Sequence, residues 1–153
     1  MEGTMPAELT ISALRRDDLH ALGGLFAAHT GRPADLSTLA GWIDTWPSAG
    51  ARGPEGLVGY AVCRGFAPDV AELAALLVAP ASRDRGVGAR LVAHVEDTCR
   101  ARGLAAIVTV ASSGYRVQGE KRSSRPFYEG LGYRVVLETA ATSVLAHDLG
   151  SSP

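Results

Sequence analysis

The chain has 153 residues with a formal net charge of −1, and 46% of them are hydrophobic. This length and composition suit a single globular domain over residues 1–153, and the near-neutral charge argues against a surface that binds nucleic acid. No apolar run is long enough to cross a bilayer, and residues 1–10 lack the basic and apolar regions of a signal peptide, so we expect a cytoplasmic protein without a membrane partner.

The first third of the chain predicts one strand followed by two helices. Residues 9–14 alternate between apolar and polar side chains, as a strand does, and residues 1–8 are expected to be frayed. Asp17 or Asp18 can cap a helix that ends near residue 31, and Asp35 can cap a second, shorter helix. Residues 47–55 are rich in Gly, Ala and Arg, so at most a weak, short strand is expected there.

The middle of the chain predicts two paired strands, a helix and a further strand. Residues 57–64 read as a strand, and the turn at residues 66–69 leads into the apolar run of residues 73–78, so these strands should pair antiparallel. Apolar residues recur at helical spacing over residues 87–102, and the glycine that follows is the expected C-terminal cap. Residues 105–110 are typical of a fully buried strand.

The last third of the chain predicts a long loop, a short helix and a hairpin. Residues 111–125 are polar and basic without periodicity, and a loop this long inside a compact domain is often functional. We expect it to be less ordered without ligand than the elements beside it. Ser124 can cap a short helix, residues 133–138 and 142–147 alternate as a hairpin, and residues 150–153 form a frayed tail.

The loop before the long helix has the composition of an anion-binding site. Gly86 and Gly88 let the backbone approach a ligand closely, and the first amides of a helix lack intrahelical partners and carry partial positive charge. Such a helix N-terminus suits a pyrophosphate, with Arg83 and Arg85 adding charge at the rim. The loop is not a Walker A sequence, and Leu91 stands where a dinucleotide fingerprint would have its third glycine.

Two motifs in this order resemble those of the GNAT superfamily of N-acetyltransferases. The form Arg83-x-x-Gly86-x-Gly88, preceded by an apolar strand and a proline, is similar to the acyl-CoA-binding motif of that family. Downstream, Phe127-Tyr128-Glu129-Gly130-Leu131-Gly132-Tyr133 resembles its second signature. The resemblance covers roughly residues 9–149 and implies an α/β fold, with a mixed, mostly antiparallel sheet of six to seven strands and helices on both faces.

The resemblance also implies an enzyme that moves an acetyl group from acetyl-CoA to a primary amine by direct attack. The amine would belong to a small molecule or a peptide, and homodimers are common in the family. Main-chain groups of Leu76, Leu77 and Val78 would pair with the pantetheine arm. The pyrophosphate would be held by Arg83, Asp84, Arg85, Gly86, Val87, Gly88 and Ala89.

The catalytic groups implied by the resemblance are a tyrosine and a carboxylate. Tyr128 would protonate the coenzyme A thiolate, a task that suits a phenol because its unperturbed pKa of about 10 keeps it protonated at neutral pH. The alternative is a tyrosine that only packs on the sheet. Glu72 would deprotonate the amine, directly or through water, unless it is simply an exposed charge near a strand end. Glu120 is a second carboxylate for that role, and Lys121 stands where the family often has Asn.

Other reactive side chains form no recognisable site. Cys63 and Cys99 lie in apolar contexts, so buried, reduced thiols are expected rather than a disulfide. The four histidines have no ligand spacing, and no metal is expected. Two alternatives to an acetyltransferase stay open: a regulatory module that binds acyl-CoA without turnover, and an enzyme that uses another acyl-CoA, such as succinyl-CoA.

Overall fold

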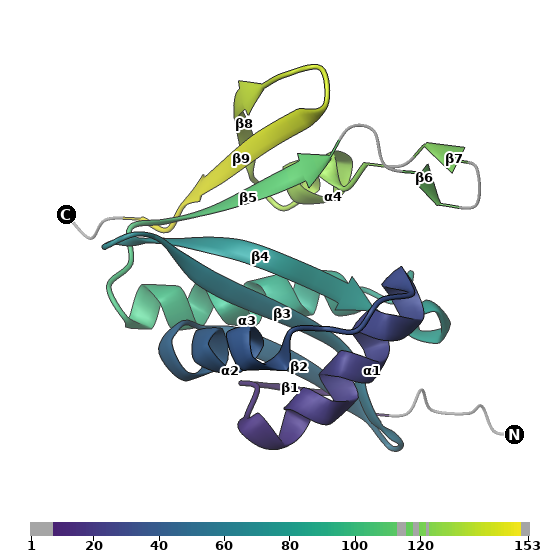
Figure 1. Cartoon of the computed structure of the whole chain (residues 1–153). Helices are drawn as coiled ribbons and strands as arrows, with labels where there is room; N and C mark the ends of the chain where they lie inside the picture. Colours follow the sequence, from purple (N-terminus) through teal and green to yellow (C-terminus); the bar gives the residue numbers. More distant parts are fainter. Residues whose placement is uncertain (1–7, 113–115, 118–119, 122, 151–153) are drawn as a thin grey trace, which may run out of the picture.

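The computed structural model of the chain describes residues 8–112, 116–117, 120–121 and 123–150. Seven strands form one sheet in the order β1-β2-β3-β4-β5-β9-β8, and neighbours in it are antiparallel except β4 and β5, which are parallel (Figure 1). The strands are β1 (Thr10–Ser12), β2 (Ser48–Gly53), β3 (Gly56–Ala67), β4 (Val70–Val78), β5 (Ala106–Ser112), β8 (Arg134–Glu138) and β9 (Thr142–Asp148). The expected mixed, mostly antiparallel sheet is confirmed.

Helices cover both faces of this sheet, as expected (Figure 1). Helices α1 (Leu19–Thr30) and α2 (Leu36–Thr45) pack on one face, against a cluster that includes Tyr60 and Val62 of β3. Helix α3 (Val87–Ala101) covers the other face, where the intervening β3 residues Ala61 and Cys63 point. The remaining helical elements are two single turns of 3-10 helix, η1 (Arg16–Asp18) and η2 (Pro80–Ser82), and the short helix α4 (Arg125–Gly130).

The helices begin and end where local chemistry directs them. The Asp35 carboxylate accepts a hydrogen bond from the Thr38 amide at 3.1 Å and caps α2. Helices α1 and α3 are followed by Gly31 and Gly103, whose φ angles are 74° and 78°. Only glycine adopts this left-handed conformation without steric cost, so it stops a helix cleanly.

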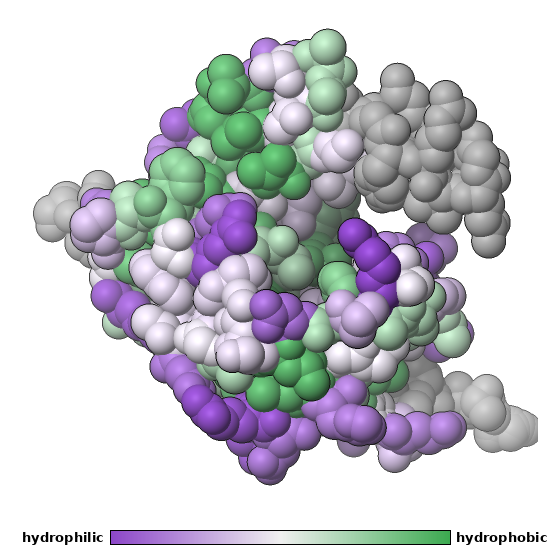
Figure 2. Space-filling model, in the orientation of Figure 1, coloured by the Kyte–Doolittle hydropathy of each residue, from purple (hydrophilic) through white to green (hydrophobic). Residues whose placement is uncertain are grey.

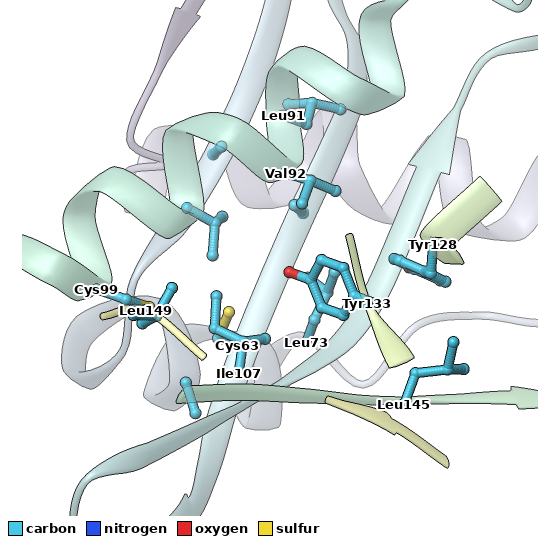
Figure 3. Close-up of a cluster of buried hydrophobic side chains, with 14 of the residues drawn as sticks. Cys63, Leu73, Leu91, Val92, Cys99, Ile107, Tyr128, Tyr133, Leu145 and Leu149 are labelled. Carbon is cyan, nitrogen blue, oxygen red and sulfur yellow. The ribbon is translucent and has the colours of Figure 1, made fainter. Parts of the chain in front are cut away.

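The apolar stripe of α3 anchors the main core. Val87, Leu91, Val92, Val95 and Cys99 recur at the spacing that keeps one helix face toward the sheet, and all five are buried. Figure 3 shows Leu91 and Val92 reaching from this helix toward the strands, beside the two tyrosines that follow β5 in the chain. The helix start, which carries the expected anion-binding loop, is therefore held rigidly against the sheet.

Strand β2 corrects the expectation for residues 47–55. It is a regular strand of six residues that pairs with β1 on one side and β3 on the other. Its small side chains are required, because Ala49 and Ala51 are fully buried in the α3 cluster. On the opposite face, a Cβ at Gly50 would come within 2.7 Å of Leu14. Close packing from both faces therefore outweighs the weak strand propensity of this sequence.

Residues 111–125 also differ from the predicted loop. Strand β5 runs on to Ser112, and β6 (Arg116–Val117) pairs antiparallel with β7 (Glu120–Lys121). The mobility predicted for this segment falls partly on residues 113–115, 118–119 and 122, which lie outside the described residues. The frayed ends expected at residues 1–7 and 151–153 also lie outside them.

Candidate active site

The sheet opens between its two parallel strands. Strands β4 and β5 pair from Val70 with Ala106 to Leu73 with Thr109, and beyond Leu73 no described strand pairs with this edge of β4. Strand β5 continues to pair with β9 as far as Ser112. The backbone amides and carbonyls of alternate β4 residues beyond Leu73 therefore face an open slot and can bond a ligand, while those of the intervening residues point toward β3.

One pocket of about 420 Å³ lies where β4 meets the start of α3. Leu76 and Val78 form its apolar wall, and Phe127 of α4 closes it. Its remaining lining residues are Ser82, Arg83, Asp84, Gly86, Val87, Gly88 and Ala89. Eight of the ten coenzyme residues expected from the sequence thus lie together here. We call this the loop pocket.

The loop pocket presents a helix N-terminus to its contents. The cap position of α3 is held by Gly86, at φ 77°, which has no side chain to bond the amides of Val87, Gly88 and Ala89. A Cβ added at Gly88 would stand 3.3 Å from the Phe127 ring. Both glycines therefore meet a physical requirement, one for its backbone conformation and one for close packing at the pocket wall.

The charged residues of the loop have distinct positions. The Arg83 guanidinium donates to the Val78 carbonyl at 2.9 Å and ties the loop to the end of β4. Asp84 adopts φ 62°, an uncommon conformation for a residue other than glycine. Arg85 is exposed and does not line the loop pocket. Leu77 also points elsewhere, because side chains alternate along β4 and Leu77 faces the α1 side.

A second pocket of about 310 Å³ lies on the α1 side of the slot, and we call it the slot pocket. Leu76 lines both pockets, so they meet at this residue. Figure 2 shows a hollow with apolar side chains in the middle of this face of the molecule. The lining consists of Phe26, His29, Thr30, Tyr60, Leu73, Ala74, Ala75, Leu76, Leu77, Thr109, Val110, Ser124 and Tyr128.

Tyr128 lies at the inner end of the slot pocket. It is 5% exposed, and its ring packs edge-on against Phe127. The ring centroid lies 5.5 Å from that of Tyr133, and Figure 3 shows these two tyrosines in the buried cluster. Burial raises the pKa of Tyr128 to about 12, and a side-chain hydrogen bond with Thr109 acts in the opposite direction. The Thr109 hydroxyl in turn donates to the Leu73 carbonyl at 3.0 Å, where the two strands part. At neutral pH this arrangement holds a protonated phenol beside the slot.

Glu72 lies apart from Tyr128. Its carboxylate accepts two hydrogen bonds from the Arg64 guanidinium, both at 3.1 Å, and it lines neither pocket. The Glu72 side chain is 15% exposed and that of Arg64 is 47% exposed. Arg64 also stacks over the Trp42 ring at 5.3 Å. The sequence placed Glu72 on β4 correctly but carried no signal for this cross-strand pair.

Several lining residues were not expected from the sequence. Phe127 belongs to the second motif, yet its place in the loop pocket depends on how α4 packs against α3. Thr109 had a usable signal, since it is the one polar residue in the apolar run of residues 105–110. No sequence signal pointed to His29, Thr30 or Tyr60, because they come from elements far apart in the chain.

The two cysteines line neither pocket. Cys63 and Cys99 are free and buried, as expected. The described part of the chain contains no group of three His, Cys, Asp or Glu side chains placed to hold a metal ion. Among the helices described, none combines the length and apolar character needed to span a membrane.

Comparison with known proteins gives one family and one fold. Residues 13–133 match the acetyltransferase (GNAT) family. The structure is similar to the ribosomal-protein-S18-alanine N-acetyltransferase of Escherichia coli, with a TM-score of 0.78 and 19% identity over 95% of this chain and 97% of that one. A search of curated proteins finds no match.

Two further crystal structures share this fold. The aminoglycoside 6′-N-acetyltransferase of Enterococcus faecium has a TM-score of 0.79 and 19% identity over 94% of this chain and 99% of that one. The PaiA N-acetyltransferase of Thermoplasma acidophilum, in complex with coenzyme A, has a TM-score of 0.73 and 16% identity over 92% and 99%. At these identities the likeness concerns the fold, and function depends on the site itself.

Proposed function

The chain belongs to the acetyltransferase (GNAT) family, and we propose that it transfers an acetyl group from acetyl-CoA to a primary amine by direct attack. The observation that carries this proposal is the meeting of the two pockets at Leu76. One pocket holds a helix N-terminus suited to an anion, and the other holds the protonated Tyr128 phenol. A ligand bound in the first can thus extend through the slot to the second.

The residues of the loop pocket fit acetyl-CoA. The amides of Arg85 to Ala89 would hold the pyrophosphate, because the first turn of α3 offers unpaired donors and positive potential. The main-chain groups of Leu76 and the Val78 amide lie on the edge of β4 that no described strand covers, and they would pair with the pantetheine arm. The main-chain groups of Leu77 point toward β3 instead, and the Val78 carbonyl accepts from Arg83. Arg83 and Asp84 would border the phosphates.

The proposed chemistry requires a proton donor at the sulfur. When bound, acetyl-CoA supplies the thioester whose carbonyl carbon the amine attacks. The Tyr128 hydroxyl would give its proton to the sulfur as the carbon–sulfur bond breaks, and its raised pKa keeps that proton available at neutral pH. Thr109, bonded to the Leu73 carbonyl, would orient the phenol. If Glu72 takes the amine proton, water must carry it, because Glu72 lines neither pocket.

Turnover with a panel of amines tests the proposal. The panel should contain alkylamines, polyamines, aminoglycosides, amino acids and peptide N-termini, each with acetyl-CoA and with succinyl-CoA, and thiol release should be recorded against a control without amine. Amine-dependent thiol release is expected with acetyl-CoA. Tight coenzyme binding with no turnover for any amine would instead support the regulatory module.

Coenzyme binding is tested separately by Gly88→Val, which would place branched carbons against Phe127 in the loop pocket. We expect acetyl-CoA affinity to fall at least about tenfold, or about 1.4 kcal/mol, in calorimetric titration. Gly24→Val in α1 is the matched control, since Gly24 has open space around it and lines neither pocket. Equal affinities in two folded variants would refute the loop pocket as the coenzyme site.

Two further expectations, on cellular location and on oligomeric state, belong to the same proposal. A cytoplasmic location is supported by the two free, buried thiols, which suit a reducing compartment. A homodimer is supported by Val136 and Leu137, which are 51% and 59% exposed on β8, the edge strand of the sheet. Sedimentation at several protein concentrations would separate monomer from dimer.

A further inference from the structure

The slot pocket, taken as the acceptor site, is lined by apolar side chains, hydroxyl-bearing side chains and one histidine. Seven of its described residues are apolar: Phe26, Leu73, Ala74, Ala75, Leu76, Leu77 and Val110. Five carry hydroxyls: Thr30, Tyr60, Thr109, Ser124 and Tyr128. The other is His29. Among the described lining residues there is no Asp, Glu, Lys or Arg.

The carboxylates on neighbouring elements already have cationic partners. Glu72 of β4 is paired with Arg64. Glu129, next to Tyr128 on α4, is paired with Arg125 at 3.4 Å, and the same guanidinium also pairs with Glu138 of β8. A second ammonium group on an acceptor would therefore meet no free carboxylate from the described elements around the pocket. Burying a cation without a partner is costly, so such an acceptor is penalised.

The hydroxyls are neutral at physiological pH. Burial raises the pKa of Tyr60 to about 12, as it does for Tyr128, so neither phenol offers a negative charge to an amine.

We propose that the acceptor is a monoamine whose remaining body is apolar and uncharged, and that polyamines and aminoglycosides are discriminated against. This inference rests on the proposed acetyl transfer and names its substrate class. The pocket volume of about 310 Å³ suits a compact alkyl or aryl body beside the hydroxyls that receive the reacting amine. The selectivity comes from the missing carboxylate rather than from size alone.

A matched pair of acceptors tests the charge directly. Hexylamine and hexane-1,6-diamine have the same chain, but the far end of the diamine carries a second ammonium, which is protonated at neutral pH. We expect kcat/KM for hexylamine to exceed that for the diamine at least about tenfold. A diamine that is turned over as well as hexylamine or better would overturn the inference while leaving acetyl transfer intact.

A charge introduced at the pocket rim should shift this preference. Val110 lines the slot pocket on β5 and is 53% exposed, so polar side chains are tolerated there. Val110→Asp should raise kcat/KM for the diamine relative to hexylamine by about three- to fivefold, and high salt should weaken the shift. Val110→Asn, equal in shape but neutral, should not shift it.

Failure of this inference can be distinguished from failure of the proposed function. If the ratio moves equally in Val110→Asp and Val110→Asn, charge does not set the preference and the inference falls. If spermidine or an aminoglycoside is acetylated and no monoamine is, the proposed function stands and the inference falls. If no amine of the panel gives thiol release, the proposed function falls, and the inference with it.

Discussion

Replacing Tyr128 with phenylalanine removes one oxygen from the slot pocket and keeps the ring. The ring contacts with Phe127 and Tyr133 depend on the aromatic carbons, so they remain. What is lost is the hydrogen bond with Thr109 and the proton that the phenol would give to sulfur. The variant therefore separates a general acid from a side chain that only packs on the sheet.

The expected effect of Tyr128→Phe on turnover is much larger than its effect on stability. General acid assistance contributes about 10²- to 10⁴-fold, so kcat should fall by at least about 100-fold. The free energy of unfolding should fall by about 1 kcal/mol or less, because Thr109 keeps its hydrogen bond to the Leu73 carbonyl. Acetyl-CoA affinity should stay within about twofold, since the proton matters mainly as charge develops on sulfur.

The control is Tyr133→Phe, which removes a hydroxyl outside both pockets. The Tyr133 hydroxyl donates to the partly buried Glu96 carboxylate at 2.9 Å, and Nε2 of His147 lies 3.9 Å from the same carboxylate. Its loss should cost about 1–3 kcal/mol of unfolding free energy and leave kcat nearly unchanged. Turnover numbers from thiol release and urea titrations measure both effects. If Tyr128→Phe turns over within about twofold of the parent, Tyr128 is not the acid.

Three further predictions follow from burial and pairing. Burial raises the pKa of Tyr60 and Tyr128 from 10 to about 12. The contribution of their neutral phenols to the free energy of unfolding is therefore complete below about pH 10 and is lost as the pH rises through about 12. Each tyrosine contributes about 2–3 kcal/mol to that loss, and an unfolding free energy that stays constant over this range would contradict it. Burial also raises the pKa of the Cys99 thiol to about 11 and raises that of the Cys63 thiol further. Neither thiol should therefore react with a disulfide reagent at about pH 8 until the protein is denatured. Labelling of either thiol in the native protein would contradict this prediction. Glu72→Gln should lower stability by about 1 kcal/mol or less and keep kcat within about threefold, because the carboxylate serves a cross-strand ion pair. A loss above about 100-fold in the folded variant would instead assign Glu72 as the base.

The sequence alone determined the loop pocket to a large extent. Gly86 adopts the left-handed conformation that glycine permits, and α3 begins directly after it. Val78, Gly88 and Ala89 line the pocket as the motif indicates. This stretch could be predicted because the strand, the loop and the first helical turn are contiguous, so their geometry depends on local backbone preferences.

The tertiary structure decided strand β2. Its sequence of Ser, Ala, Gly and Arg has little intrinsic preference for a strand. The strand forms because Ala49 and Ala51 fit beneath α3, and because Gly50 leaves room for Leu14 on the other face. These neighbours come from distant parts of the chain, so no local pattern could reveal them.

The tertiary structure also decided which side chains share the slot pocket. Tyr128 and Thr109 flank the opening between β4 and β5, and Tyr60 and His29 reach it from the other side of the sheet. Glu72 lies on the same strand as Leu76, yet Arg64 of the neighbouring strand holds it outside this pocket. Sequence periodicity predicts which face of an element is apolar. Which side chains meet across the slot depends on strand order, register and the point where two parallel strands part, and these are set by packing over the whole sheet.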